Sequence, residues 1–118
     1  MKTKRARACD FTASERQHIY ERDRMRCIFC EARYRMDEVD SFGTEALEIM
    51  HYIPRSQGGL GSRRNAALGC VGHHRMLDNG SKGYRPEMME IFREYLKQYY
   101  DDWDERNLIY DKWKEIKP

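Results

Sequence analysis

The chain has 118 residues, of which 36% are charged and 40% hydrophobic, and its formal net charge is +2. A chain of this length fits one domain and buries a smaller share of its surface than a longer chain, so a stabilising cross-link is expected. Its eight tyrosines, four phenylalanines and two tryptophans supply core anchors that a disordered chain lacks. No apolar run approaches the roughly 20 residues that span a bilayer, and no apolar segment follows the basic start, so we expect no membrane association and a cytoplasmic location.

Basic side chains gather at the start and in the middle of the chain, whereas acidic ones collect after residue 100. This asymmetry predicts a basic face on a nearly neutral molecule, which suits phosphate groups. The alternative is that the central arginines only solvate the surface. Arginine geometry matches phosphate, and most contacts to nucleic acid go to its backbone. The residues predicted to bind DNA are Arg55, Arg63, Arg64 and Arg75.

The N-terminal half of the chain predicts one helix and one knuckle. The first ten residues are basic, and we expect them to be flexible. Thr12 and Glu15 form a capping box, which predicts a helix over residues 14–24. A tight Cys27-x-x-Cys30 knuckle follows, and the polar stretch after it predicts a short strand or a loop that ends in turn residues at 41–43.

The middle of the chain predicts a ββα unit. Residues 46–53 are apolar and β-capable, and they predict a strand. Pro54 and the glycines at 58 and 59 predict a loop after this strand, in which glycine allows close approach of the backbone. Residues 65–77 predict a turn that leads into a helix, and Asn79-Gly80 ends that helix.

The C-terminal part predicts two helices. Pro86 suits the first position of a long helix. The apolar residues that recur at helical spacing, and that we expect to face the core, are Met89, Phe92, Leu96 and Tyr99 or Tyr100. Residues 103–113 predict a second, short helix, and the side chains expected to pack against the body are Leu108, Ile109 and Trp113.

Two distant residue pairs predict a zinc site. Cys27-x-x-Cys30 and Cys70-x-x-His73 are knuckles of the kind by which distant loops share one tetrahedral Zn²⁺. Four protein ligands leave no open position for water, so the predicted role of the zinc is structural. Cys9 is the alternative fourth ligand, because it would complete an all-thiolate site. The cysteines could instead be buried without metal, or form disulfides, which fit less well without an export signal.

His51 lies at the end of the predicted strand, Asn65 begins the turn, and His74 follows nine residues after Asn65 and directly after the second knuckle. In this order and context the chain resembles the HNH, or ββα-metal, nuclease family. The resemblance covers nearly the whole chain and includes the run from Glu48 to Gly59. The tail looks like that of small phage and prophage HNH nicking enzymes, with Tyr95-Leu-Lys, Asp102-Trp-Asp, Leu108-Ile-Tyr and Lys112-Trp113.

The resemblance implies an α+β fold in a single domain, residues 1–118. Its core, at residues 11–82, is a small zinc-stapled ββα-metal unit, also called an HNH or His-Me finger. An N-terminal helix precedes the motif, residues 1–10 form a flexible basic N-terminus, and residues 83–118 form a C-terminal helical extension.

The resemblance also assigns the chemistry. Phosphodiester hydrolysis needs a base, and a neutral imidazole can deprotonate water near neutral pH, which is the role implied for His51. A divalent cation, Mg²⁺ or Mn²⁺, stabilises the negative charge on the leaving 3′-oxygen and the non-bridging oxygens. Asn65 fixes the loop that carries His51, or binds the metal. The residues assigned to catalysis are therefore His51, Asn65 and His74.

The implied ligands of the catalytic ion include one departure from the family pattern. His74 and Asp78 are four residues apart on one helix face, so both can hold the same ion. The family usually has a ligand immediately before the base, where this chain has Met50, whose thioether is a poor ligand for Mg²⁺. Strand alternation places Glu48 on the same face as Met50, so we expect Glu48 to replace the missing ligand.

The function implied by the resemblance is a metal-dependent endonuclease that nicks double-stranded DNA as a monomer, or cuts both strands as a weak homodimer. The resemblance also implies a phage or prophage origin in a bacterial host, and a phage terminase as an expected further partner. The alternative is a zinc-stapled DNA-binding module with a decayed nuclease site, which Met50 favours. A thiol-disulfide redox protein built on Cys27 and Cys30 is a third alternative. It fits poorly, because this cysteine pair follows a charged helix and not a strand.

Overall fold

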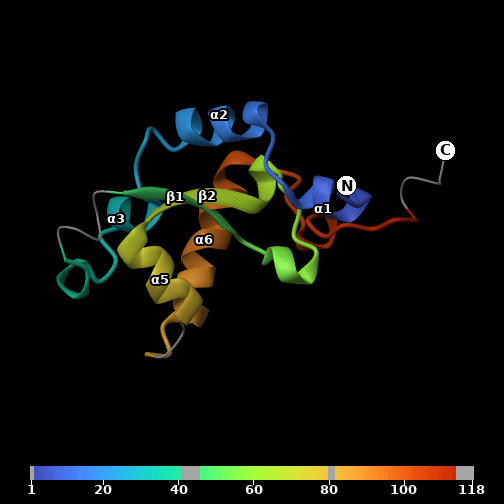
Figure 1. The fold of residues 1–118 in the computed structure, drawn as a ribbon. Coiled ribbons are helices and arrows are strands. Elements are labelled where there is room, and N and C mark those ends of the chain that lie inside the picture. The colour runs from blue at the N-terminus through green and yellow to red at the C-terminus, as the bar shows by residue number, and fades with distance from the viewer. Residues whose placement is uncertain (1, 41–45, 80–81, 114–118) are drawn as a thin grey trace.

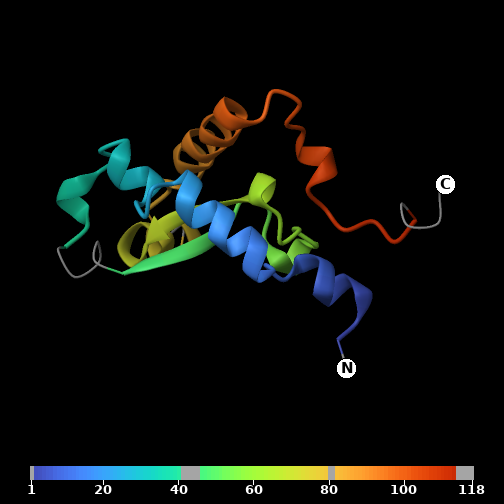
Figure 2. The same ribbon diagram turned by 90° about the horizontal axis from the view of Figure 1, so that it is seen from above.

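The computed structural model describes residues 2–40, 46–79 and 82–113. Its centre is a two-stranded antiparallel sheet of β1 (Leu47–His51) and β2 (Ala66–Cys70), paired from Leu47 opposite Cys70 to His51 opposite Ala66. Helix α2 (Ala13–Arg22) covers one face, and α5 (Val71–Asn79) covers the other with α6 (Arg85–Tyr99) beside it (Figures 1 and 2). The other helical elements are α1 (Lys4–Cys9), α3 (Ile28–Glu31) and the 3₁₀ turns η1 (Met36–Glu38), η2 (Arg55–Gln57), η3 (Arg63–Asn65) and η4 (Glu105–Asn107).

The two faces of β1 carry different side chains, because successive residues of a strand point in opposite directions. Met50 is fully buried in the main core with side chains of α5 and α6. On the opposite face, Ile49 packs against a smaller cluster around Ile19 of α2. His51 therefore faces the α2 side of the sheet, whereas Glu48 shares the α5 side with Met50.

A buried ion pair fastens α2 to the sheet. Nε of Arg22 donates to Asp23 at 2.7 Å, and the two side chains are only 4% and 0% exposed. Asp23 also accepts hydrogen bonds from the Leu68 N–H and the Tyr95 hydroxyl, at 2.8 and 2.6 Å. The guanidinium donates to the main-chain carbonyls of Arg63 and Ala66, both at 2.7 Å. These partners satisfy the charges that folding removes from water.

The N-terminal region contains more helix than predicted. Residues Lys4–Cys9, expected to be flexible, form α1, which the Thr3 hydroxyl caps and whose last residue, Cys9, is buried. The helix predicted over 14–24 is α2, which ends at Arg22, and the Thr12 hydroxyl accepts the Glu15 N–H at 3.1 Å, which confirms the N-cap. The other half of the predicted capping box is replaced, because the Glu15 carboxylate pairs with Arg63. The polar stretch after the knuckle holds η1 and no strand among its described residues, and the turn residues at 41–43 lie outside the described part.

Strand β2 differs from the prediction. Residues 66–70, expected to belong to a turn leading into a helix, pair with β1 along their whole length. All five are buried, because both faces of this strand are covered by helices. The helix begins only at Val71 and is described as far as Asn79, and the residues that would test its predicted end at Asn79-Gly80 lie outside the described part.

The C-terminal part also departs from its prediction. In α6 the fully buried side chains are Met88, Phe92 and Leu96, and the predicted Met89 is partly buried against the same core. Of the alternatives Tyr99 and Tyr100, Tyr99 is exposed and Tyr100 packs against the core. Residues 103–113 form no second helix beyond the short η4. In that segment Leu108 is buried as expected, whereas Ile109 and Trp113 are exposed.

The loop between the strands is held from both sides. A Cβ added to Gly59 would lie 1.7 Å from the carbonyl oxygen of Ile53, so this position accepts only glycine. The predicted close approach of the backbone is confirmed. The Gly61 N–H donates to Ala8 of α1 at 2.9 Å. The Tyr110 N–H donates to the carbonyl of residue 58 at 2.8 Å. Helix α1 and the C-terminal segment therefore fix the loop that follows His51.

Candidate metal centre and active site

Three thiols and one imidazole come together where α3, β2 and α5 meet. Nδ1 of His73 lies 3.7, 3.5 and 3.2 Å from the sulfur atoms of Cys27, Cys30 and Cys70. All four ligand atoms lie within 4.8 Å of one another, and no other set of three or more such groups in the described part meets so closely. These are the predicted knuckle residues, and they could hold a metal ion such as zinc. Cys9, the alternative ligand, does not belong to this cluster.

Hydrogen bonds around the cluster aim its donors inward. Nε2 of His73 is 2.7 Å from the carbonyl oxygen of Tyr34, and because a carbonyl only accepts, Nε2 carries the ring proton. The lone pair of Nδ1 therefore faces the sulfurs. The contact between Cys27 and Cys70 lowers the pKa of the Cys70 thiol and raises that of Cys27, and His73 lowers the pKa of Cys70 further, so Cys70 is the first of the thiols to lose its proton. A thiolate beside a neutral imidazole is the donor chemistry that zinc uses.

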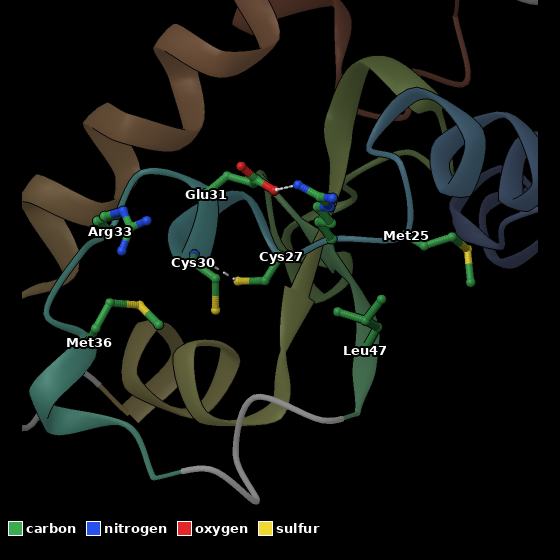
Figure 3. A pocket seen from close by; sticks show the side chains of 8 residues that line it. Met25, Cys27, Cys30, Glu31, Arg33, Met36 and Leu47 are labelled. Atoms are coloured by element: carbon green, nitrogen blue, oxygen red, sulfur yellow. Dashed lines mark hydrogen bonds and ion pairs between the residues drawn. The ribbon is translucent and has the colours of Figure 1, made fainter.

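One side of the cluster opens on a hollow of about 480 Å³. Cys27 and Cys30 line it together with Met25, Met36 and Leu47, and Figure 3 shows both cysteines beside this hollow. Cys30 is partly exposed, whereas the other cysteines of the cluster are buried. A chelator can therefore approach the cluster from the Cys30 side.

His51 ends β1 and is held by contacts from the N-terminal region. Its Nε2 is 3.3 Å from the carbonyl oxygen of Cys9, and its ring packs on Phe11 with the centroids 4.7 Å apart. Since the carbonyl accepts, Nε2 carries the proton of a neutral imidazole, and Nδ1 keeps a free lone pair. Burial lowers the pKa of His51, the Cys9 contact opposes this, and the charges of Arg55 and His74 lower it further. The ring can thus accept a proton at Nδ1.

His51 lines a hollow of about 450 Å³ between α1, α2 and η2. Three cationic side chains, Lys2, Arg16 and Arg55, line the same hollow together with the carboxylate of Asp10. Of these, only Arg55 is a predicted DNA contact. The packing of α2 on the sheet and of α1 on the loop after β1 brings the others to His51. The sequence marks Lys2 only as part of a basic start and gives no signal for Arg16.

Asn65 bridges the loop that follows His51, and its side chain is fully buried. Oδ1 accepts the Ile53 N–H at 2.8 Å, and Nδ2 donates to the carbonyls of Ile53 and Leu60 at 3.2 and 2.9 Å. Because the amide is committed to the backbone and shielded from solvent, it suits the loop-fixing role and not that of a metal ligand.

Of the three residues predicted to hold the catalytic ion, Glu48 and Asp78 both contact His74. Nδ1 of His74 is 2.9 Å from Glu48, and Nε2 is 3.2 Å from Asp78. Each carboxylate lies within hydrogen-bonding distance of a different ring nitrogen. The carboxylates lie at opposite ring nitrogens, so the three ligand atoms do not converge on one point. No hydrogen bond or ring contact within the described residues joins this cluster to His51.

Met50 lies in the core and takes no part in this cluster. Its sulfur lies over Gly69, where an added Cβ would be 2.3 Å from it, so the side chain fills the space that glycine leaves. Met50 is fully buried, whereas Glu48 and Asp78 are 49% and 66% exposed. The predicted sharing of one face by Glu48 and Met50 is confirmed by their common position over α5.

The four arginines predicted to bind DNA have different surroundings. Arg75 is exposed on α5. The other three pair with carboxylates of the chain itself: Arg55 with Asp10, Arg63 with Glu15 at 2.6 Å, and Arg64 with Asp102 at 2.7 Å. A DNA phosphate would have to compete with these carboxylates.

No family model, curated protein or solved structure matches this chain. The functional argument therefore depends on its own residues and their geometry. Each helix in the described ranges is too short or too polar to cross a membrane.

Proposed function

We propose that the chain is an HNH-type, divalent-metal-dependent endonuclease that hydrolyses phosphodiester bonds in double-stranded DNA, with His51 as the general base. The observation that carries the proposal is the state of His51, whose Nε2–H is directed to the Cys9 carbonyl and whose Nδ1 is free. An imidazole in this state can take a proton from water. The cations in the adjoining hollow suit the phosphate groups of DNA.

The Cys27, Cys30, Cys70 and His73 cluster holds a structural zinc ion in this proposal. Four protein ligands leave no position for a reactive water. The cluster joins α3 to the end of β2 and the start of α5, so it fixes the helix that carries His74.

Glu48, His74 and Asp78 would hold the catalytic Mg²⁺ or Mn²⁺, because carboxylate oxygens and imidazole are suitable donors. When bound, the ion stabilises negative charge on the phosphate oxygens. The two carboxylates must turn toward one ring nitrogen of His74, which their exposure permits. One such centre cuts one strand, so a monomer nicks DNA and a dimer cuts both strands.

Cleavage of supercoiled plasmid tests this proposal. Zinc-loaded protein with added Mg²⁺ or Mn²⁺ is expected to convert the plasmid to open-circle or linear DNA, and the same protein without added ion is not. Glu48→Gln is expected to weaken both metal binding and cleavage, and unchanged values would remove Glu48 from the site. The absence of cutting with every divalent ion, by folded protein, contradicts the proposal.

The second candidate is a zinc-stapled DNA-binding module with a decayed nuclease site. The observation in its favour is that Met50, at the usual ligand position, is buried away from the carboxylates. Retention of DNA in a gel without any cleavage distinguishes this candidate from the nuclease.

A further inference from the structure

The anion in the His51 hollow is a side chain of the protein itself. The Asp10 carboxylate accepts a hydrogen bond from Lys2 Nζ at 2.6 Å and pairs with the guanidinium of Arg55. Contacts with Lys2 and then Arg55 lower the pKa of Asp10, although partial desolvation opposes them, so the group is charged at neutral pH. Arg16 and His51 line the same hollow. Two cations pair with this carboxylate and a third, Arg16, lines the same hollow, so together they form an anion-binding site that a side chain of the protein already occupies.

The backbone of Asp10 is fixed, whereas its carboxylate is replaceable. Its N–H donates to the carbonyls of Ala6 and Arg7 and ends α1, so this cap does not need the side chain. Gly61 packs so closely that a Cβ there would lie 2.2 Å from the Asp10 carbonyl oxygen. The side chains of Lys2, Asp10 and Arg55 are 66%, 33% and 46% exposed. Exposed ion pairs are weak, so another anion can take the carboxylate's place.

We propose that Lys2, Arg16 and Arg55 bind a DNA phosphate beside His51, and that Asp10 occupies this site until DNA displaces it. The inference rests on the proposed function, to which it adds the phosphate-binding residues and an internal competitor. Displacement must cost affinity, because Lys2 and Arg55 gain contacts to the phosphate only when they lose their contacts to Asp10. The protein therefore binds DNA more weakly than its cations would allow.

Asp10→Asn tests the competitor, because asparagine keeps the shape and the backbone cap but removes the charge. Affinity for a short fluorescent duplex is measured by anisotropy on zinc-loaded protein without Mg²⁺ or Mn²⁺. Glu90→Gln is the matched control, since it removes one charge from an exposed pair with Arg93 on α6. We expect Asp10→Asn to tighten binding about threefold to fivefold more than the control, the scale of one exposed ion pair. In an Arg55→Gln background this gain should shrink.

Equal effects of Asp10→Asn and Glu90→Gln, or weaker binding by folded Asp10→Asn, would overturn the proposal. If circular dichroism shows that Asp10→Asn does not fold, Lys2→Gln and Arg16→Gln carry the test. Each must weaken binding more than Arg93→Gln does, and equal affinities overturn the proposal. Protein that shows the expected binding changes but cuts no DNA contradicts only the nuclease function. Protein that cuts DNA, with Asp10→Asn no different from the control, contradicts only the phosphate site.

Discussion

Replacement of Asn65 by alanine is expected to destabilise the protein by about 3 kcal/mol, at about 1 kcal/mol for each of its hydrogen bonds. The bonds join Oδ1 to the Ile53 N–H, and Nδ2 to the carbonyls of Ile53 and Leu60. Because Asn65 is fully buried, water cannot replace the lost partners without opening the loop. The change should therefore also loosen the segment that follows His51.

Urea unfolding of zinc-loaded protein measures this cost, and the melting temperature should fall by about 10 °C. The control is Asn79→Ala, at an exposed asparagine that ends α5, and its effect should stay within about 0.5 kcal/mol. A loss of less than about 1 kcal/mol for Asn65→Ala would refute the reasoning. It would mean that the loop keeps its shape through α1 and the C-terminal segment alone.

Three further predictions concern the metal cluster, the buried ion pair and pH. Cys70→Ser should abolish zinc binding and the folded near-ultraviolet spectrum, whereas the unaltered chain should release one zinc ion per molecule to a chelating dye; a native spectrum without metal contradicts this. Asp23→Ala should lower the free energy of unfolding in urea by about 3–5 kcal/mol, because it leaves the Arg22 guanidinium buried and unpaired; a loss below about 1 kcal/mol would show that water reaches Arg22. Burial holds the pKa of His51 below its ordinary 6.5, and the neutral ring is the active form. As pH is lowered, kcat/KM should therefore stay constant through pH 6.5 and fall only at lower pH, where the ring gains a proton. An inflection above pH 6.5 would count against His51 as the base.

Local spacing is enough to predict the metal cluster and the cap of α2. Two knuckles of matching type leave few ways to complete a four-ligand site. In the structure all four knuckle residues lie together: Cys27, Cys30, Cys70 and His73. Thr12 and Glu15 act within a single turn, so their contact does not depend on distant residues. The sequence does not predict β2, because its small residues carry no β-branched signal and the strand forms only by pairing with β1.

The parts that sequence does not predict depend on contacts between distant segments. Two contacts position helix α1: the hydrogen bond from the Gly61 N–H to the Ala8 carbonyl, and the packing of the buried Cys9 side chain. Cys9 acts on His51 through its backbone carbonyl, which every residue type offers, so no residue pattern can mark it. Arg16 likewise reaches the His51 hollow only because α2 packs across the sheet.

Single-turnover cleavage of a labelled duplex by His51→Ala tests the central claim most directly. His18→Ala is the matched control, since His18 lies on α2 and is not among the residues that line the His51 hollow. Loss of a general base should slow cleavage by about 100-fold to 10,000-fold at saturating Mn²⁺, with DNA affinity retained, while His18→Ala stays close to the unaltered protein. If His51→Ala cuts DNA as fast as His18→Ala, His51 is not the base, and the nuclease mechanism built on it is wrong.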